Sequence, residues 1–336
     1  MSGLVSTIIP VYNRSGMIQK AVQSVLDQTY RPIEIILVDD GSTDDTLAEL
    51  NRLGGEHPDL IKVAHRENGG PGLARETGRL LASGEFIQYL DSDDLLLPSK
   101  FELQVTALQE HPECGIAYGK SRLVDVEGNT LREVSKWTGR KYETLFPALL
   151  MYRWWHTHTP LYRRSLCDQI GPWPKNQPED WDYDARAGAL QARLAFCDAV
   201  VSCHRNHDAD RVTKRPYLNY LPQEAWFLPR LYDCAVKAGV KPTSPEMQQF
   251  VRWAFSLSRR VAALGLSPQA AELLDLAEDA GGGKTLGMSA MCACKSLLGW
   301  RITGRLCRGL EGIATMLNRK PKFNPAMHQY WNLLVS

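Results

Sequence analysis

The chain has 336 residues, of which 44% are hydrophobic and 23% are charged, an ordinary balance for a soluble globular protein. This length predicts one large domain with an extension, or two domains. The formal net charge is +1, so the overall charge gives no argument for nucleic acid or against it, and no such partner is expected.

The eight cysteines include no Cys-x-x-Cys pair, and their spacing is typical of neither a zinc site nor a secreted disulfide framework. We therefore expect reduced thiols in a cytoplasmic protein. The N-terminal residues run directly into a strand-like segment, so no signal peptide is expected. No charge-free apolar run approaches the ~20 residues that a membrane-spanning helix needs.

The first part of the chain alternates between strand and helix patterns. Short apolar runs rich in β-branched residues predict buried strands, and apolar residues at helical spacing follow each run. The expected strands are Leu4–Ile9 (ended by Pro10), Ile33–Val38, Leu60–Val63 and Glu85–Leu90. The expected helices begin near Met17, after a cap at Ser42 or Thr43, near Pro71 and at Pro98.

Four strand–helix units in succession predict an α/β protein with a parallel, doubly wound sheet. In such sheets, ligands bind beyond the carboxyl ends of the strands. Three polar segments follow these ends, namely Pro10–Asn13, Asp39–Asp40 and Asp91–Asp94. Because independent motifs converge on one edge, we expect a functional site there.

The segment Asp91–Asp94 is the most informative of the three. It places three carboxylates within four residues, which raises the energy of the free protein unless a cation offsets their charge. Oxygen ligands suit a hard divalent ion such as Mg²⁺ or Mn²⁺, and such an ion usually serves phosphates. A solvated acidic turn with a helix cap is the alternative interpretation.

The second part of the chain has a different character. Residues 137–181 hold five of the nine tryptophans, for which core packing is favoured over stacking against sugar rings. From about Tyr217 the pattern is mostly helical. Residues 281–322 carry eight Lys or Arg against one acid, and apolar residues recur there at helical spacing. Such a basic amphipathic helix can lie on an anionic membrane surface, although packing on the rest of the protein is the favoured interpretation.

Five segments together resemble the large family 2 of glycosyltransferases, which have the GT-A fold with a Rossmann-like sheet. They are Val5–Asn13, Val38–Asp44, Asn68–Arg75, Leu90–Asp94 and Glu179–Trp181. The resemblance implies a catalytic domain at residues 1–215, with a nucleotide-binding half at 1–112 and an acceptor-binding half at 113–215. A helical C-terminal extension would follow at residues 216–336.

Members of this family transfer a sugar from a nucleotide diphosphate to an acceptor, usually with inversion at the anomeric carbon. The resemblance implies a metal-dependent, inverting glycosyltransferase that uses a nucleotide sugar, most commonly a UDP-sugar. The acceptor would be a hydroxyl group of a glycan or of a lipid-linked molecule. We expect neither a transmembrane helix nor the Gln-x-x-Arg-Trp motif of processive members such as cellulose and chitin synthases. We therefore predict single additions rather than polymerisation, with the enzyme in the cytoplasm or at the cytoplasmic face of the membrane.

On the donor side, the resemblance implies that Pro10, Tyr12 and Asn13 line the base pocket, with the ring of Tyr12 facing the nucleobase. Asp40 would accept a hydrogen bond from a ring nitrogen of the base, and Asp39 would support it or the ribose. A turn with a helix cap is the alternative for these two acids.

Arg75 would supply positive charge toward the diphosphate, because its planar guanidinium suits phosphate oxygens. Many family members have Asn after this arginine, whereas this chain has Glu76. An ordinary exposed arginine on a helix is the alternative interpretation.

The segment Asp91-Ser92-Asp93 resembles the Asp-x-Asp motif of the family. Asp93 would contact the ribose or the metal, and Asp94 would complete a site for Mn²⁺ or Mg²⁺ that bridges the two phosphates. The late Arg-x-His segment makes His207 a further candidate ligand. His156 and His158 are expected to line the acceptor side or to serve packing.

Glu179 and Asp180 resemble the acidic pair that supplies the general base of the inverting enzymes. Asp180 is expected to take the proton of the acceptor hydroxyl, and Glu179 to position it or to bind the acceptor. Trp155 and Trp181 are candidate acceptor contacts. A helix N-terminus rich in acids is the alternative.

Two other functions are considered. A metal-dependent nucleotidyltransferase also uses paired acids, but it would need a Gly-rich loop with Lys or Arg after the first strand, where Pro10–Arg14 stands. A catalytically inactive nucleotide-sugar-binding module is the other alternative, and the intact Asp93 and Asp180 argue against it.

Overall fold

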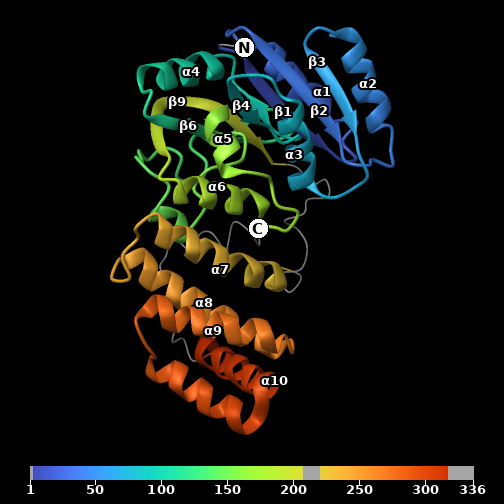
Figure 1. The fold of residues 1–336 in the computed structure, drawn as a ribbon. Helices are drawn as coiled ribbons and strands as arrows, with labels where there is room; N and C mark the ends of the chain where they lie inside the picture. Colours follow the sequence, from blue (N-terminus) through green and yellow to red (C-terminus); the bar gives the residue numbers. More distant parts are fainter. Residues whose placement is uncertain (1–2, 207–219, 317–336) are drawn as a thin grey trace. The chain divides into compact units, whose positions relative to one another are not determined.

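The structure is a computed structural model that describes residues 3–206 and 220–316 (Figure 1). The chain forms two compact units. The first contains Met1–Leu145 and Arg153–His207, and the second contains Phe146–Tyr152 and Asp208–Ser336.

The first unit is built on a nine-stranded mixed sheet with the order β3-β2-β1-β4-β8-β6-β9-β5, to which β7 adds by pairing with β6. One half is parallel and consists of β3 (Ile61–His65), β2 (Ile33–Asp39), β1 (Val5–Val11) and β4 (Phe86–Tyr89). The helices that follow its strands are α1 (Ile18–Leu26), α2 (Thr46–Glu56), α3 (Pro71–Leu81) and α4 (Lys100–Glu110). The prediction of an α/β protein with a mostly parallel, doubly wound sheet is confirmed.

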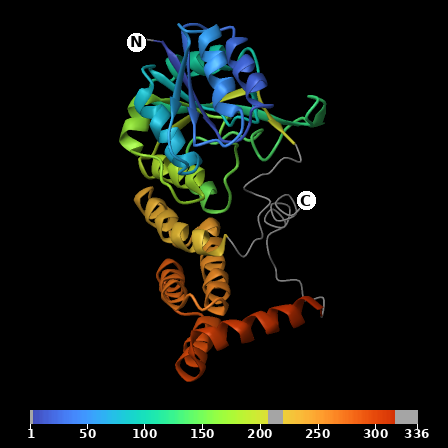
Figure 2. The same ribbon diagram turned by 90° about the vertical axis from the view of Figure 1, so that its right-hand side faces the viewer.

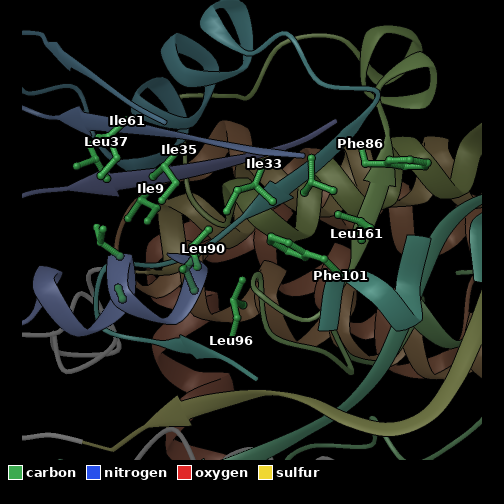
Figure 3. Packing of buried hydrophobic residues seen from close by; sticks show 14 of the residues in the cluster. Ile9, Ile33, Ile35, Leu37, Ile61, Phe86, Leu90, Leu96, Phe101 and Leu161 are labelled. Carbon is green, nitrogen blue, oxygen red and sulfur yellow. The ribbon is translucent and has the colours of Figure 1, made fainter. Parts of the chain in front are cut away.

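The parallel strands are buried on both faces. Alternate residues such as Ile9, Ile35 and Leu37 fill a core shared with α1, α2 and α4 (Figure 3). On the opposite face, Ile8 packs against α3, where Gly78 leaves room for its side chain. This burial explains why the strands read as continuous apolar runs instead of alternating ones.

Strand β1 continues through Pro10, contrary to the prediction that this proline ends it. β1 pairs with β2 as far as Val11 but with β4 only as far as Ile8. Because backbone groups of successive residues point to opposite sides of a strand, the nitrogen of Pro10 points to the side where β4 has already ended. The proline therefore removes no ladder hydrogen bond.

The other half of the sheet is mixed. β8 (Leu161–Arg163) lies antiparallel to β4 and to β6 (Cys114–Val124), which pairs in parallel with β9 (Arg193–Arg205). The short strands β5 (Leu95–Leu96) and β7 (Thr130–Arg132) complete it. α5 (Arg164–Ile170) and α6 (Glu179–Ala189) accompany this half. Trp154 and Trp155 are fully buried here.

The second unit is helical, as the sequence predicts from about Tyr217 onward. Its elements are η1 (Ala148–Leu150), α7 (Leu221–Lys237), α8 (Pro245–Ala263), α9 (Ser267–Gly281) and α10 (Leu286–Met316). α10 bends at Gly299, whose φ of 74° interrupts the helix (Figure 2). No helix in the described part of the chain combines the length and hydropathy needed to span a membrane.

Candidate functional site

The polar segments predicted to follow the strands do lie along one edge of the sheet. The backbone nitrogen of Asp40 donates to the carbonyl oxygen of Val11 at 2.8 Å, so β1 and β2 end level with each other. In the same way, the backbone nitrogen of Leu90 donates to Ile8 at 3.0 Å where β4 ends. The acidic residues after β2 and β4 therefore lie on either side of the end of β1.

Asp40 anchors the glycine-rich loop. Its Oδ1 accepts a hydrogen bond from the backbone nitrogen of Gly69 at 3.1 Å, and its Oδ2 accepts one from Gly70 at 2.7 Å. The guanidinium of Arg66 forms an ion pair with the same carboxylate. Since an ionised carboxylate has about four lone-pair sites, these three contacts leave some acceptor capacity on this carboxylate, whose side chain is 4% exposed. Recognition of a nucleobase by Asp40 stays a prediction.

Asn13 joins the end of β1 to the loop after β2. Its φ of 51° lies in the left-handed region, which asparagine tolerates better than most residues. Its backbone nitrogen donates to Oγ of Ser42 at 3.0 Å, and its side-chain oxygen accepts from the backbone of Thr43 at 2.9 Å. The prediction that Ser42 or Thr43 caps α2 is wrong, because the helix begins only at Thr46. Asp45 precedes it and forms no side-chain cap.

The other residues predicted for the donor differ in exposure. Tyr12 is 45% exposed, so part of its ring is open to a ligand. Pro10 is buried in β1, and Ser92 is buried after β4. Asp39 is fully buried and pairs with Nδ1 of His65 at 2.7 Å. Of these four residues, only Tyr12 has an exposed side chain, and its contact with a nucleobase stays a prediction.

Arg75 connects two acidic motifs that are far apart in the sequence. Its Nη2 lies 2.6 Å from Oδ1 of Asp91, and its Nη1 lies 2.8 Å from Oε1 of Glu179. The guanidinium is buried and lies 4.9 Å from the ring centre of Trp173. Burial lowers the pKa of Arg75, but the two carboxylates outweigh it and raise the pKa above its usual value. Arg75 is thus engaged with carboxylates, whereas the sequence assigned it to the diphosphate.

Glu76, which stands where many family members have Asn, forms two contacts in the structure. Its Oε1 pairs with Arg79 at 2.8 Å, and its Oε2 accepts a hydrogen bond from the backbone of Trp173 at 3.1 Å. Through the second contact, Glu76 in α3 binds the loop that precedes α6. The same loop holds Trp173 against the guanidinium of Arg75.

Glu179 and Asp180 form the first turn of α6 but have opposite electrostatic environments. The Glu179 side chain is 9% exposed, and burial raises the pKa of this carboxyl. The Asp180 side chain is 29% exposed, and its Oδ2 lies 2.8 Å from Nη1 of Arg153. Although burial opposes it, the attraction of Arg153, Arg75 and Lys136 lowers the pKa of Asp180. Asp180 is therefore the more accessible and the more readily ionised of the pair.

Arg153 and Asp184 were missed by the sequence analysis. Nε of Arg153 lies 2.6 Å from Oδ2 of Asp184, a buried carboxylate that also accepts hydrogen bonds from Trp155 and Tyr162 at 2.7 and 2.8 Å. Trp155 is 0% exposed, so it offers no ring face to an acceptor in this structure. Trp181 is also buried, but less completely. In the sequence, only the arginine directly before two tryptophans, Arg153-Trp154-Trp155, could have drawn attention to this network.

One group of side chains in the described residues could hold a metal ion. Asp94, His158 and His204 each offer a ligand atom, and these atoms lie within 4.8 Å of one another. Nδ1 of His158 lies 2.7 Å from the Asp94 carboxylate, yet it is a buried nitrogen without a hydrogen bond of suitable geometry. Imidazoles are common ligands of divalent transition metals, and a carboxylate is a ligand that Mn²⁺ accepts. The residues present therefore fit a metal ion.

This group differs from the predicted ligand set of Asp93, Asp94 and His207. Asp94 belongs to both sets, whereas His207 lies outside the described residues. His158 was assigned to the acceptor side or to packing, and His204 was passed over within its own segment. Burial opposes ionisation of Asp94, but the two imidazoles outweigh it and hold the pKa of this carboxyl well below its usual range.

A third histidine packs beside this group. The ring of His156 stacks on that of His204 at 4.3 Å and on that of His158 at 5.2 Å between ring centres. Its Nε2 lies 2.9 Å from Oγ of Ser135. His156 thus packs against both imidazoles, which is one of the two roles predicted for it, and a position on the acceptor side stays a prediction.

The mixed sheet, with acidic residues at the carboxyl edge of its parallel half, agrees with the GT-A fold of glycosyltransferases. Glycosyl transferase family 2 matches residues 6–171. An uncharacterized glycosyltransferase of Rickettsia typhi is 34% identical over 228 residues, which make up 66% of this chain and 69% of the relative. The chain belongs to glycosyl transferase family 2, and the prediction of a glycosyltransferase is confirmed at this level.

Solved structures share the fold. TarS from S. aureus, in complex with UDP-GlcNAc, has a TM-score of 0.59 and 19% identity, over 91% of each chain. The mannosyltransferase PcManGT from Pyrobaculum calidifontis, in complex with GDP-Man and Mn²⁺, has a TM-score of 0.50 and 19% identity, over 90% of this chain and 86% of the other. The chain spans only 22% and 34% of the lengths of the first two curated relatives it matches.

A sequence pattern in α8 bears on the prediction of single additions. Gln249-Phe250-Val251-Arg252-Trp253 spells Gln-x-x-Arg-Trp, the pattern of processive family members such as cellulose and chitin synthases. Gln249, Phe250 and Val251 are buried within the helical unit. The prediction of single additions rested on the expected absence of this pattern and of transmembrane helices. The expectation about the pattern is wrong, and its presence weakens the prediction.

Proposed function

We propose that this chain is a metal-dependent, inverting glycosyltransferase in which an acceptor hydroxyl attacks the anomeric carbon of a nucleotide sugar. The observation that carries the proposal is the position of Arg75 between Asp91 and Glu179. The guanidinium of Arg75 thus contacts both Asp91, in the motif proposed to bind the donor, and Glu179, in the acidic pair proposed to supply the base. The catalytic domain would be residues 1–215, with residues 216–336 as its extension.

The donor would bind at the edge formed by β1, β2 and β4. The half-exposed ring of Tyr12 would stack on the base, and the remaining acceptor capacity of Asp40 would suit an N–H of uracil. Asn13 and Asp39 would hold the surrounding loops through the hydrogen bonds described above. A UDP-sugar is the proposed donor, and TarS, which shares the fold, was solved with UDP-GlcNAc.

We propose that Asp94, His158 and His204 hold the metal ion, with Asp93 on the side of the ribose or the ion. The ion would neutralise charge on the departing nucleotide diphosphate. The two imidazoles and the carboxylate support a divalent transition metal. Nδ1 of His158 supports it too, since it lies beside the Asp94 carboxylate without a hydrogen bond of suitable geometry. PcManGT, which shares the fold, was solved with Mn²⁺. A role for His207 stays a prediction.

Asp180 is proposed as the general base. A base for this reaction must be ionised before it accepts a proton and must be open to the acceptor. The lowered pKa and the partly exposed side chain of Asp180 meet both conditions. Glu179, held by Arg75, would fix the start of α6. The acceptor, a glycan or lipid-linked hydroxyl, would approach from this side.

Two measurements test the proposal. We expect one nucleotide sugar, added with Mn²⁺, to raise the melting temperature, and Asp93→Ala to weaken this stabilisation. We expect Asp180→Asn to bind the donor as the wild type does but to lose turnover about 10²- to 10⁴-fold.

Each outcome has a defined meaning. No stabilisation by any nucleotide would contradict the donor site and favour a different ligand. Donor binding by the wild type without transfer or hydrolysis would identify an inactive binding module. Full turnover by Asp180→Asn would remove Asp180 from the role of base.

A further inference from the structure

Helix α10 exposes more large apolar side chains than any other described element. They are Leu286, Leu297, Leu298, Ile302 and Leu306. Leu286 is 92% exposed and Leu297 is 84% exposed. Single exposed leucines are common on protein surfaces and need no explanation, whereas neighbouring apolar side chains can form a patch that binds a partner or a membrane.

After the bend at Gly299, the helix has three distinct faces. Thr303 is buried, and a Cβ on Gly304 would lie 2.4 Å from the backbone nitrogen of Ala263, so this face packs closely against α8. Ile302 and Leu306, one turn apart, form an apolar stripe that is 52% and 51% exposed.

A basic stripe runs beside the apolar one. Arg301 and Arg305 are also one turn apart, and both are exposed. Before the bend, Nζ of Lys295 lies 4.7 Å from the ring centre of Trp300, which places a cation and an indole next to Leu297 and Leu298 in the chain. Lys, Arg and Trp beside aliphatic side chains are the composition that membrane–water interfaces favour.

The charge of this segment selects among the possible occupants. Residues 286–310 contain four Lys or Arg and no acidic residue, and residues 281–322 contain eight against one. In a two-fold contact, a second copy of the chain would present the same positive surface, and like charges placed opposite each other repel. A surface that carries negative charge and accepts apolar side chains complements both stripes, and an anionic bilayer has both properties.

We propose that α10 binds the surface of a membrane containing anionic lipids. The part of the helix after Gly299 would lie in the plane of the interface, with Ile302 and Leu306 at the acyl boundary and with Arg301 and Arg305 at the phosphates. The buried face of the helix would stay packed on α8. This inference uses none of the residues proposed for catalysis and is independent of the proposed reaction.

Co-sedimentation of the full chain with lipid vesicles tests the proposal. We expect binding to vesicles of phosphatidylcholine mixed with phosphatidylglycerol, little binding to phosphatidylcholine alone, and a loss of binding as salt screens the charges. The double variant Arg301→Gln, Arg305→Gln should weaken binding about five-fold for each charge removed. Arg132→Gln, on the exposed strand β7, is the matched control and should bind as the wild type does.

A second pair of variants addresses the apolar stripe. Ile302→Gln with Leu306→Gln should abolish vesicle binding without changing the net charge, whereas Leu190→Gln, at a 43% exposed position in the other unit, should not. Circular dichroism would verify that each variant is folded. If the double variant of Ile302 and Leu306 does not fold, the double arginine variant and the salt series still test whether α10 binds anionic vesicles.

Three results would overturn the proposal. The first is that the wild type binds both kinds of vesicle equally or binds neither. The second is that the double arginine variant binds as the wild type does. The third is that the wild type is a dimer and that Ile302→Gln with Leu306→Gln converts it to a monomer. The last result, measured by light scattering, would identify the face as a contact between copies of the chain.

Discussion

Among the individual side chains, Arg153 most directly controls the proposed base. It contacts Asp180 at 2.8 Å and Asp184 at 2.6 Å, and it opposes the rise in pKa that burial alone would cause at Asp180. A guanidinium in this position keeps the carboxylate ionised at neutral pH and also fixes its orientation. Arg153 is therefore a positioning residue for the base.

We predict that Arg153→Gln raises the pKa of Asp180, because it removes the nearest positive charge. As the pH is lowered, Asp180 should then become protonated earlier, and activity should be lost sooner than in the wild type. The acidic limb of the kcat/KM profile should therefore move up by about 1–3 pH units. Arg153→Lys, which retains the charge, should restore much of the difference.

The control for this prediction is an arginine in α6, the helix that contains Asp180. Arg186 pairs with Asp182 at 2.8 Å, one turn along α6. Arg186→Gln should leave the acidic limb unchanged. If the limb of folded Arg153→Gln also stays where the wild type has it, Arg153 does not act on the base.

At the scale of elements, the packing of α3 on the sheet holds Arg75 above the carboxyl edge. Gly78 is the contact point, since a Cβ at this position would lie 2.3 Å from Cγ2 of Ile8 in β1. A separation this short forces either the helix or the strand to move. The close approach of α3 to β1 therefore requires glycine.

We predict that Gly78→Ala destabilises the protein by about 1–3 kcal/mol, because overpacking strains the contact between α3 and β1. Gly55→Ala is the matched control, since Gly55 lies in α2 with nothing within 4 Å of its Cβ position. It should be neutral or stabilise by up to about 1 kcal/mol, as helix propensity favours alanine. Chemical denaturation measures both, and equal stabilities of the two variants would contradict the packing argument.

At the scale of the molecule, Glu34 links several strands of the parallel half. Its Oε1 accepts hydrogen bonds from Ser6 and from the backbone of Ser83, both at 2.6 Å, and its Oε2 pairs with Lys62 at 2.8 Å. Burial raises the pKa of this carboxyl, but these donors outweigh it and lower the pKa from 4.5 to about 2. The folded state therefore binds a proton less readily than the unfolded chain.

Because the folded pKa is the lower one, Glu34 stabilises the protein fully above the unfolded pKa of 4.5, and this contribution is lost as the pH falls toward about 2. We predict that Glu34→Gln lowers stability at neutral pH by about 1.5–3 kcal/mol and that this difference narrows in acid. Melting curves across this range measure the effect. Glu56→Gln, at an exposed position, should change little, and a pH-independent loss in Glu34→Gln would contradict the linkage.

The sequence by itself determined the parallel half of the sheet and the family. Buried parallel strands are continuous apolar runs, so β1, β2 and β4 and the acids at their ends are visible in local patterns. Even there, it misjudged Pro10, because the cost of a proline depends on whether a neighbouring strand lies on that side.

Only the tertiary structure decided which side chains meet. Arg75 and Glu179 are 104 positions apart, and His204 contacts Asp94 from 110 positions away. The mixed half of the sheet, which brings β9 and the segment before β8 to the acidic edge, has short or irregular strands with weak periodicity. Pairing between distant strands depends on loop closure and shared burial, and neither is encoded in the local pattern of residues.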